Sequence, residues 1–308
     1  MAWREIQRKT VRWTDISSPT PEQIESLRER FGLLPIHLQD VRSIGQRPKL
    51  DVSANYLFLV LIFPIYNRAT REIVPSEIDF IVGKDSLVTV HDGSLESLNE
   101  LVTLAGENAS ANNRTLQDGP MGLVYTCLDR LISGCNPMLD HMSRDLRTIE
   151  QKIFNGAERD MVSDILISRR NITDFRKIMQ AHKNTLKKLI YVSESRQLFT
   201  GPTQASGFYQ LVEQTKEIWE HLASFKETIE ALHQTNETLI SYHLNVIMKN
   251  YTTFSVIIFA MTLLATLFAI EVQGTPLLHL RFGFWYIVLV EVCLAAGLYL
   301  TFKRNRWI

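Results

Sequence analysis

The chain has 308 residues and equal numbers of basic and acidic side chains, 33 of each, so its formal net charge is zero. It has no basic run outside the last few residues, which gives no support for nucleic-acid binding. It also lacks a P-loop, a Rossmann glycine pattern, GxSxG and HExxH, so neither an enzyme nor a bound cofactor is expected. The three cysteines have no CxxC spacing and are expected to be reduced structural thiols.

Residues 1–133 predict an α/β domain. Segments rich in β-branched and aromatic residues predict strands over residues 3–15, 56–63, 77–82 and 87–91. Apolar periodicity and turn residues predict helices over residues 22–31, 35–41, 95–108 and 120–131. The first nine residues, MAWREIQRK, contain no apolar segment typical of a signal peptide, so this domain is expected in the cytoplasm.

Long helices follow. Residues 134–200 predict a helical hairpin, with one helix over 138–154 and a second over 160–199. A stalk helix is expected over residues 205–251, and no Pro or Gly interrupts the chain from Phe208 to Ile270. A helix of roughly 60 residues would be about 90 Å long. The stalk has a near-heptad apolar seam, Leu211, Ile218, Leu222, Phe225, Ile229, Leu232 and Leu239.

Two apolar segments, residues 252–271 and 282–302, are each long enough to cross a hydrocarbon core of roughly 30 Å. Residues 272–281 form the loop between them, and residues 303–308 form a basic tail. Lysine and arginine flank the spans on the side of the stalk and tail but are absent from residues 271–280. The positive-inside rule therefore predicts a multi-pass protein of the cell (inner) membrane with both termini in the cytoplasm.

One stripe along the end of the stalk and the first span mixes polar and bulky apolar side chains. Its members are Asn245, Met248, Tyr251 (or the adjacent Thr252), Ser255, Phe259, Thr262 and Thr266. We call it the 245–266 stripe. Steps of three and four residues keep it on one side of a helix. The hydroxyls either promote close helix packing or line a channel that dewetting gates at the bulky side chains.

Two carboxylates belong to the spans. Glu271 is the last residue of the first span. It is either an ordinary charged residue at the membrane interface or one member of an acidic ring at a pore mouth. Glu291 lies near the middle of the second span, where an acid is either neutral and hydrogen-bonded or functional.

The chain resembles the CorA-type divalent-cation transporters, including their zinc-carrying ZntB-like branch, along nearly its whole length. The resemblance rests on several segments: VRWTD at residues 11–15 with SSPTP at 17–21, GQRPKLD at 45–51, VPSEIDF at 74–80, VTVHDG at 88–93, Met248-Lys249, and the basic tail with Trp307. It implies a cytoplasmic αβα funnel, a long stalk helix and two C-terminal spans per subunit. It further implies a homopentamer in a lipid bilayer, whose first span lines the pore with the 245–266 stripe.

One departure from the family pattern affects selectivity. The family signature after the first span is Gly-Met-Asn, whereas the aligned triplet here is Ala269-Ile270-Glu271. A carboxylate has a higher field strength than an amide and binds partly dehydrated ions. Glu271, with His279 as a second candidate ligand, suits zinc better than magnesium. Zinc or another transition metal and magnesium both stay open as the transported and regulatory ion.

The function expected from these features is a homopentameric channel or transporter for divalent metal cations. The alternative is a CorA-like membrane scaffold or regulatory protein that has lost transport. The acids considered for a regulatory metal site are Asp79, Asp92, Glu213 and Glu220. His37 and Asp40 are interpreted as domain surface and not as a metal site.

Overall fold

We describe the fold from a computed structural model, which describes residues 2–8, 11–43, 45–107, 119–196, 198, 202–270, 282–305 and 307. The contacts within the chain divide it into two compact units, Met1–His233 and Gln234–Ile308. The first unit holds an α/β core and several long helices, and the second holds two apolar helices.

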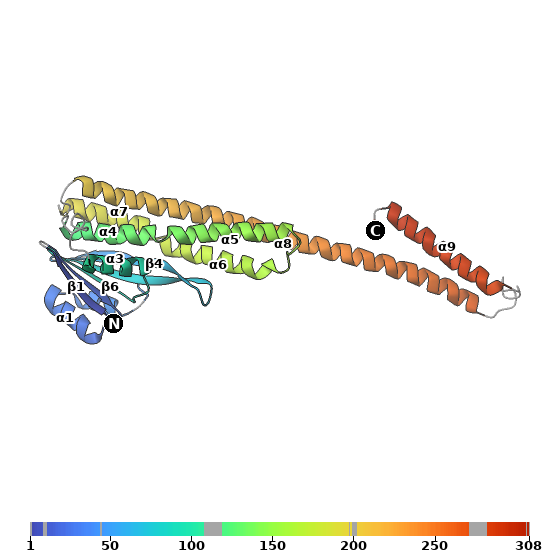
Figure 1. The fold of residues 1–308 in the computed structure, drawn as a ribbon, viewed down its shortest axis with the longest axis horizontal. Coiled ribbons are helices and arrows are strands. Elements are labelled where there is room, and N and C mark those ends of the chain that lie inside the picture. The colour runs from blue at the N-terminus through green and yellow to red at the C-terminus, as the bar shows by residue number, and fades with distance from the viewer. Residues whose placement is uncertain are drawn as a thin grey trace. The chain divides into compact units, whose positions relative to one another are not determined.

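A six-stranded mixed sheet lies at the centre of the first unit (Figure 1). Its strands are β1 (Ala2–Arg8), β2 (Val11–Ser17), β3 (Lys49–Val52), β4 (Leu57–Asn67), β5 (Glu72–Val82) and β6 (Ser86–His91). The strand order is β1-β2-β6-β5-β4-β3, in which only β2 and β6 pair in parallel. β4 is buried on both faces from Leu57 to Leu61, so helices must cover both sides of the sheet.

Helices cover the two faces of the sheet, as the family resemblance implies. On one face lie α1 (Pro21–Phe31) and α2 (Pro35–Arg42), which pack Leu27 and Leu38 into a cluster with Val60 and Ile81 of the sheet. On the other lie α4 (Gly119–Ser133), α6 (Met161–Met179) and α7 (His182–Ser195), with α3 (Glu96–Glu107) against α4. Figure 1 shows α1 and α4 on opposite sides of the strands. The predicted αβα layering is confirmed.

The remaining helices are α5 (Asn136–Phe154) and α8 (Pro202–Ala269). Within the first unit, α6 contacts α8: the Arg176 guanidinium lies 4.5 Å from the centre of the Trp219 ring, and Arg169 and Glu230 form an ion pair of 3.3 Å. The seam predicted for the stalk is largely buried here, at Leu211, Ile218, Leu222, Ile229 and Leu232. The apolar periodicity therefore identified the packed face of α8.

The structure differs from the prediction at three elements. The strand expected over residues 3–15 is a hairpin of β1 and β2. The helix expected over residues 160–199 ends at Met179 and restarts at His182, whose buried ring lies edge-on against Phe63 of β4 at 4.9 Å. The second helix thus begins where His182 packs against the sheet, and the apolar periodicity of the sequence does not reveal such a contact. β3, a four-residue edge strand, was not predicted at all.

β4 also continues past Pro64, where the sequence prediction ended the strand. Pro64 lies directly opposite Pro75 of β5. The ladder of β3 with β4 reaches only Val60, and the ladder of β6 with β5 only Ile78. No neighbouring strand therefore needs the N–H groups that the two prolines lack, so the hairpin tolerates both.

Asn171 of α6 holds the tip of the β4–β5 hairpin. Its Oδ1 accepts a hydrogen bond from the Ile73 backbone N–H at 3.0 Å, and its Nδ2 donates to the Arg71 carbonyl at 2.9 Å. Arg71 is left-handed, with φ 59°, and its guanidinium pairs with Asp164 of α6 at 3.1 Å. Asn171 thus satisfies two backbone groups beside an unfavourable backbone conformation.

Asp79 of β5 lies buried beneath α2, 4 % exposed, directly opposite Val60 in the sheet. Its Oδ1 has no hydrogen-bond partner among the described residues. Burial, with the nearby carboxylates Glu77 and Asp40, raises the pKa of Asp79 well above its usual range. The folded protein therefore favours the uncharged acid at this position.

Replacing Asp79 with Asn is expected to stabilise the protein at about pH 8, by about 1 kcal/mol or more. Because the pKa of Asp79 is raised in the folded state, its ionisation costs stability as the pH rises above the unfolded value of about 4. The gain should therefore shrink as the pH falls towards about 4. The measurement is the thermal midpoint of the purified full-length protein against pH.

The matched control is Asp40→Asn. Asp40 forms an ion pair of 2.5 Å with Lys49, so this variant should lower the midpoint at the pH where Asp79→Asn raises it. A lower midpoint for Asp79→Asn at about pH 8 would show that the carboxylate is ionised and stabilising.

Asn171→Ala is expected to lower the free energy of unfolding by about 2 kcal/mol, because the Ile73 N–H and the Arg71 carbonyl lose their partner. Arg170→Ala, which removes an exposed ion pair with Glu72 of the same hairpin, should cost less than about 1 kcal/mol. Chemical denaturation of both variants tests this, and equal losses would contradict the role given to the amide.

Candidate functional site

Two helices of the second unit are long and apolar enough to cross a membrane: the end of α8, and α9 (Gly283–Arg304). The mean hydropathy of their most apolar segments is 2.0 and 1.9, and only 6 % of each segment is buried. Water is a poor solvent for such large apolar surfaces, so lipid or further copies of the chain must cover them.

Each of these helices has one partly covered face. On α8 the less exposed residues are Lys249, Thr253, Ile257, Ala260, Met261, Leu264 and Phe268. On α9 they are Ile287, Val288, Glu291, Leu294, Ala295, Leu298 and Phe302. Both sets recur every three or four residues, so each lies along one side of its helix. As α8 and α9 are the two described helices of this unit, we take these faces to turn towards each other, and call them the covered faces.

The 245–266 stripe lies on the opposite side of α8. At about 100° per residue, Ser255 is about 200° from Thr253, and Phe259 is about 200° from Ile257. Every member of the stripe is exposed in the single chain. A shallow hollow runs along its first half, lined by Met248, Tyr251, Thr252, Ser255, Val256 and Phe259. The stripe therefore points away from α9.

Two hydroxyls of the stripe are oriented by their own helix. Thr262 Oγ1 donates to the Ile258 carbonyl at 2.8 Å, and Thr266 Oγ1 donates to the Leu263 carbonyl at 2.8 Å. Their hydrogens are used within α8, so the oxygens present lone pairs to whatever lies beyond the helix. Such oxygens can accept hydrogen bonds from water or approach a cation.

The residues expected at the outer mouth are only partly described. α8 ends at Ala269, and Ile270 follows as an exposed residue. Glu271 and His279 lie outside the described residues. Their place at a pore mouth therefore stays a prediction from the sequence.

The structure separates the acids considered for a regulatory metal site. Asp79 is buried, whereas Asp92 accepts hydrogen bonds from Ser94 and Ser76. Despite partial burial, these hydrogen bonds lower the pKa of Asp92. Glu213 and Glu220 are exposed partners of Lys216. In the part of the chain that the structure describes, no three metal-ligating side chains gather into a cluster.

The interpretation of His37 and Asp40 as domain surface is wrong. Both are buried, at 3 % and 7 % exposed. The His37 ring stacks on Phe58 at 4.5 Å, and its Nδ1 lies 2.8 Å from the Tyr56 hydroxyl. These partners come from β4 and the residue before it, so a single-sequence reading of α2 could not identify the buried side.

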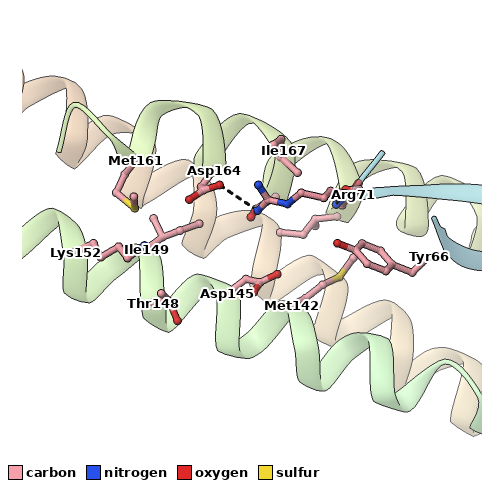
Figure 2. Close-up of a pocket in the computed structure, with 13 residues that line it drawn as sticks. Tyr66, Arg71, Met142, Asp145, Thr148, Ile149, Lys152, Met161, Asp164 and Ile167 are labelled. Carbon is pink, nitrogen blue, oxygen red and sulfur yellow. Dashed lines mark hydrogen bonds and ion pairs between the residues drawn. The ribbon is translucent and has the colours of Figure 1, made fainter. Parts of the chain in front are cut away.

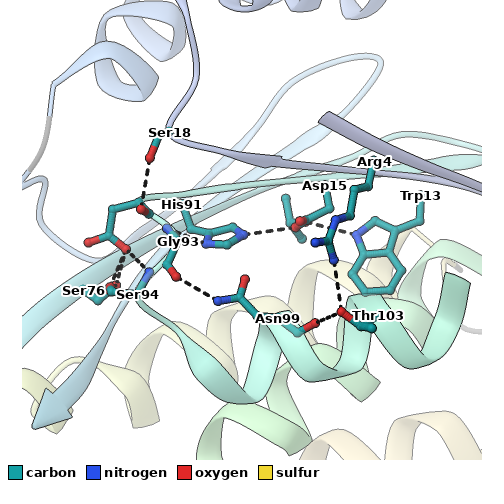
Figure 3. Close-up of polar contacts among 12 residues, drawn as sticks. Arg4, Trp13, Asp15, Ser18, Ser76, His91, Gly93, Ser94, Asn99 and Thr103 are labelled. Carbon is teal, nitrogen blue, oxygen red and sulfur yellow. Dashed lines mark hydrogen bonds and ion pairs between the residues drawn. The ribbon is translucent and has the colours of Figure 1, made fainter. Parts of the chain in front are cut away.

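A second polar group that the sequence did not point to lies between the parallel strands β2 and β6 (Figure 3). Asp15 accepts a hydrogen bond from the Thr89 hydroxyl at 2.5 Å. The Gly93 N–H donates to Nδ1 of His91, which leaves Nε2 of His91 to donate to Asp15 at 3.2 Å. Partners satisfy this buried carboxylate, and the network ties two strands together.

Figure 2 shows a pocket of about 210 Å³ between α5, α6 and the β4–β5 hairpin. Arg71 and Asp164 pair across it at 3.1 Å, and Asp145 pairs with His141 at 3.1 Å. Arg71 and Asp164 therefore neutralise each other at this pocket. The membrane helices, whose polar stripe is exposed and points away from α9, are the stronger candidate site.

Comparisons with known proteins support this choice. A family model described as "CorA-like Mg2+ transporter protein" matches residues 8–304. The cobalt/magnesium transport protein CorA of Thermotoga maritima is 21% identical over 302 residues, covering 97% of this chain and 84% of that protein. The putative metal ion transporter YfjQ of Bacillus subtilis is 24% identical over 307 residues, covering 96% and 89%.

Solved structures show the same fold. The complete structure of the CorA magnesium transporter from Methanocaldococcus jannaschii has a TM-score of 0.81 at 19% identity, covering 97% of this chain and 92% of that one. The full-length CmaX protein has a TM-score of 0.74 at 18% identity, covering 96% and 89%. The expected fold, with a long stalk helix and two C-terminal transmembrane helices, is confirmed. With a family model that spans nearly its whole length, the chain belongs to the CorA-like Mg²⁺ transporter family, and is a membrane transporter of metal cations, not an enzyme.

Proposed function

We propose that copies of this chain, five by the family resemblance, assemble around an axis and conduct divalent metal cations through a pore lined by the 245–266 stripe. The observation that carries the proposal is the opposition of two faces of α8. The less exposed face is the one that we take to turn towards α9, and the polar stripe lies on the opposite side, where none of the described residues covers it. Lipid offers no hydrogen-bond partners to such a stripe, whereas a water-filled axis does.

The spacing of the stripe supports an axial arrangement. Six steps lead from Asn245 to Thr266, a distance of 21 residues, so the mean step is 21/6, or 3.5 residues. A repeat of about 3.5 residues keeps one face of each helix towards the centre of a left-handed bundle. Identical helices with this repeat can therefore bring all members of the stripe to one axis.

The stripe combines two kinds of side chain with different effects on a cation. Ser255, Thr262 and Thr266 offer neutral oxygens that bind weakly enough to release an ion. Met248 and Phe259 narrow the path with apolar groups, which favours closure by dewetting. Conduction would then depend on widening the pore at these bulky residues.

Glu271 is assigned to the outer mouth, as a ring of carboxylates that replaces the neutral Gly-Met-Asn filter of the family. A ring of acids concentrates cations at the entrance. With His279 as a second ligand, the mouth would favour zinc or another transition metal, while carboxylates alone would also accept magnesium. The basic flanks of the spans support an inner-membrane orientation with both termini in the cytoplasm.

Glu271→Gln is expected to slow divalent-cation entry into liposomes by about tenfold or more at low ionic strength, because the charge that concentrates cations is lost. Glu271→Asp keeps the charge and should retain most of the flux. Initial rates for magnesium, zinc, cobalt and nickel, followed with an enclosed indicator dye, provide the measurement. If Glu271→Gln transports every metal at the wild-type rate, the acidic ring has no role in entry.

His279→Ala separates the two metal classes in the same assay. Loss of zinc flux with retained magnesium flux supports a mixed carboxylate–imidazole site at the mouth. If the His279→Ala variant keeps the flux of both metals, the Glu271 carboxylates alone are the metal ligands at the mouth.

Cysteine accessibility tests which face of α8 meets water. In a Cys293→Ser background, Ser255→Cys should react with a charged thiol reagent, and Ile257→Cys on the covered face should react at least about tenfold more slowly, because apolar surroundings suppress the thiolate. Cys127 and Cys135 are buried, and burial raises the pKa of both thiols, so they add no background. Equal reaction rates at Ser255→Cys and Ile257→Cys would contradict a water-filled axis along the stripe.

A scaffold or regulatory role is the second candidate, and the absence of a Gly-Met-Asn tripeptide from the sequence favours it. The two candidates differ in one result. An intact oligomer that carries none of the four metals supports the scaffold, and flux that Glu271→Gln reduces supports the transporter.

A further inference from the structure

Glu291 is the acidic residue of α9, and its position is unusual for a charged group. It lies eight residues after Gly283 and thirteen before Arg304, which places it about 12 Å and about 20 Å from the two ends of the helix. In a hydrocarbon core of roughly 30 Å, both ends are too distant for a short side chain to reach the lipid headgroups. Glu291 therefore stays within the apolar layer.

Glu291 also lies on the covered face of α9, in line with Ile287, Val288, Leu294 and Ala295. The covered face of α8 includes Ile257, Ala260, Met261 and Leu264. These residues offer no hydrogen-bonding side chain. The carboxyl is thus held between the two spans, behind the helix that carries the 245–266 stripe.

The charged and titratable groups on the two covered faces are few. Among the described residues, the covered face of α9 has none besides Glu291, and the covered face of α8 has only Lys249. Lys249 lies twenty residues before the end of α8, about 30 Å along the helix, whereas Glu291 lies about 12 Å into α9. If the two helices run back along each other, about 18 Å of helix separates the two side chains. Lys249 cannot pair with Glu291 at that separation.

No hydrogen bond or ion pair links Glu291 to any residue that the structure describes. An ionised carboxylate in hydrocarbon without a cation is strongly disfavoured, whereas a protonated carboxyl needs only weak polar partners. The proton is thus the counter-ion that best fits these surroundings.

We infer that Glu291 is an intramembrane proton-binding site, whose carboxyl is held in the protonated form between α8 and α9. Its ligand is the proton, and losing that proton would place an unpaired charge between the pore-lining helix and its neighbour. The inference rests on the two spans and their covered faces, and not on the proposed pore.

A hydrophobic carbodiimide tests the site, because it partitions into lipid and reacts with protonated carboxyls. The carboxyl oxygen bonds to the central carbon of the carbodiimide, and the carboxyl proton moves to one of its nitrogens, which gives an O-acylisourea. The acyl group then migrates from oxygen to nitrogen and gives a stable N-acylurea. No atom leaves and no redox partner is needed, so the product is heavier by the mass of one carbodiimide molecule.

Wild-type protein in liposomes of neutral lipid is treated with dicyclohexylcarbodiimide across a pH series, and the labelled peptide is identified by mass spectrometry. We expect Glu291 to be labelled at neutral and mildly acidic pH and labelling to fall as the pH rises. Glu291→Gln should abolish the label on this peptide, and Glu291→Asp should retain it. Glu217, exposed on the water-facing part of α8, is the internal control and should stay unlabelled.

Two results would overturn the inference: no labelling of Glu291 at any pH, or labelling equal to that of Glu217 and independent of pH. Because the assay needs no metal flux, it separates this inference from the proposed function. A protein that is labelled but carries no metal would refute the transport proposal alone, and a protein that carries metal but is not labelled would refute the proton site alone.

Discussion

The hydrocarbon layer supplies no hydrogen-bond partners, and this constraint governs the second unit. Every polar group there must be satisfied by its own helix, by another copy of the chain or by water. Thr262 and Thr266 meet the requirement by donating to carbonyls of α8. Ser255 and Glu291 have no such partner among the described residues. These unsatisfied groups mark the positions where a pore or a bound proton adds what one chain lacks.

The first unit follows the same rule with different solutions. Asp15 is buried between strands and accepts hydrogen bonds from Thr89 and His91, and Asp40 is buried beside Lys49. Asp79, close to that ion pair, has one oxygen without a partner, and burial raises its pKa. Burial alone therefore does not determine the charge of an acid. Asp15 and Asp40 lie beside hydrogen-bond or ion-pair partners, whereas Asp79 is buried near two other carboxylates.

The sequence predicted what depends on periodicity and length. The buried seam of α8 follows from apolar spacing, because one covered face imposes a repeat on a helix, and the two spans follow from the length of their apolar segments. The αβα layering was implied by the family resemblance. The prediction from sequence failed at positions whose burial depends on contacts with segments that are distant in the chain. Phe58 buries His37 from another element, and His182 packs on Phe63 where a continuous helix was expected. At the candidate site, the sequence predicted the 245–266 stripe. Only the exposure of each residue in the structure showed that the stripe lies on the side of α8 away from α9.

The proposed pore separates two tasks that a single binding site would combine. An ion must be attracted strongly enough to enter and held weakly enough to leave. Carboxylates at the mouth serve attraction, since their charge acts over about a Debye length. The hydroxyls of α8 let the ion pass, since each offers a neutral oxygen. In Thr262 and Thr266 the hydroxyl hydrogen already bonds to a carbonyl of the helix. A carboxylate deeper in the stripe would bind a divalent cation too tightly to release it, and the acid inside α9, Glu291, lies on the covered face of α9 and not on the stripe.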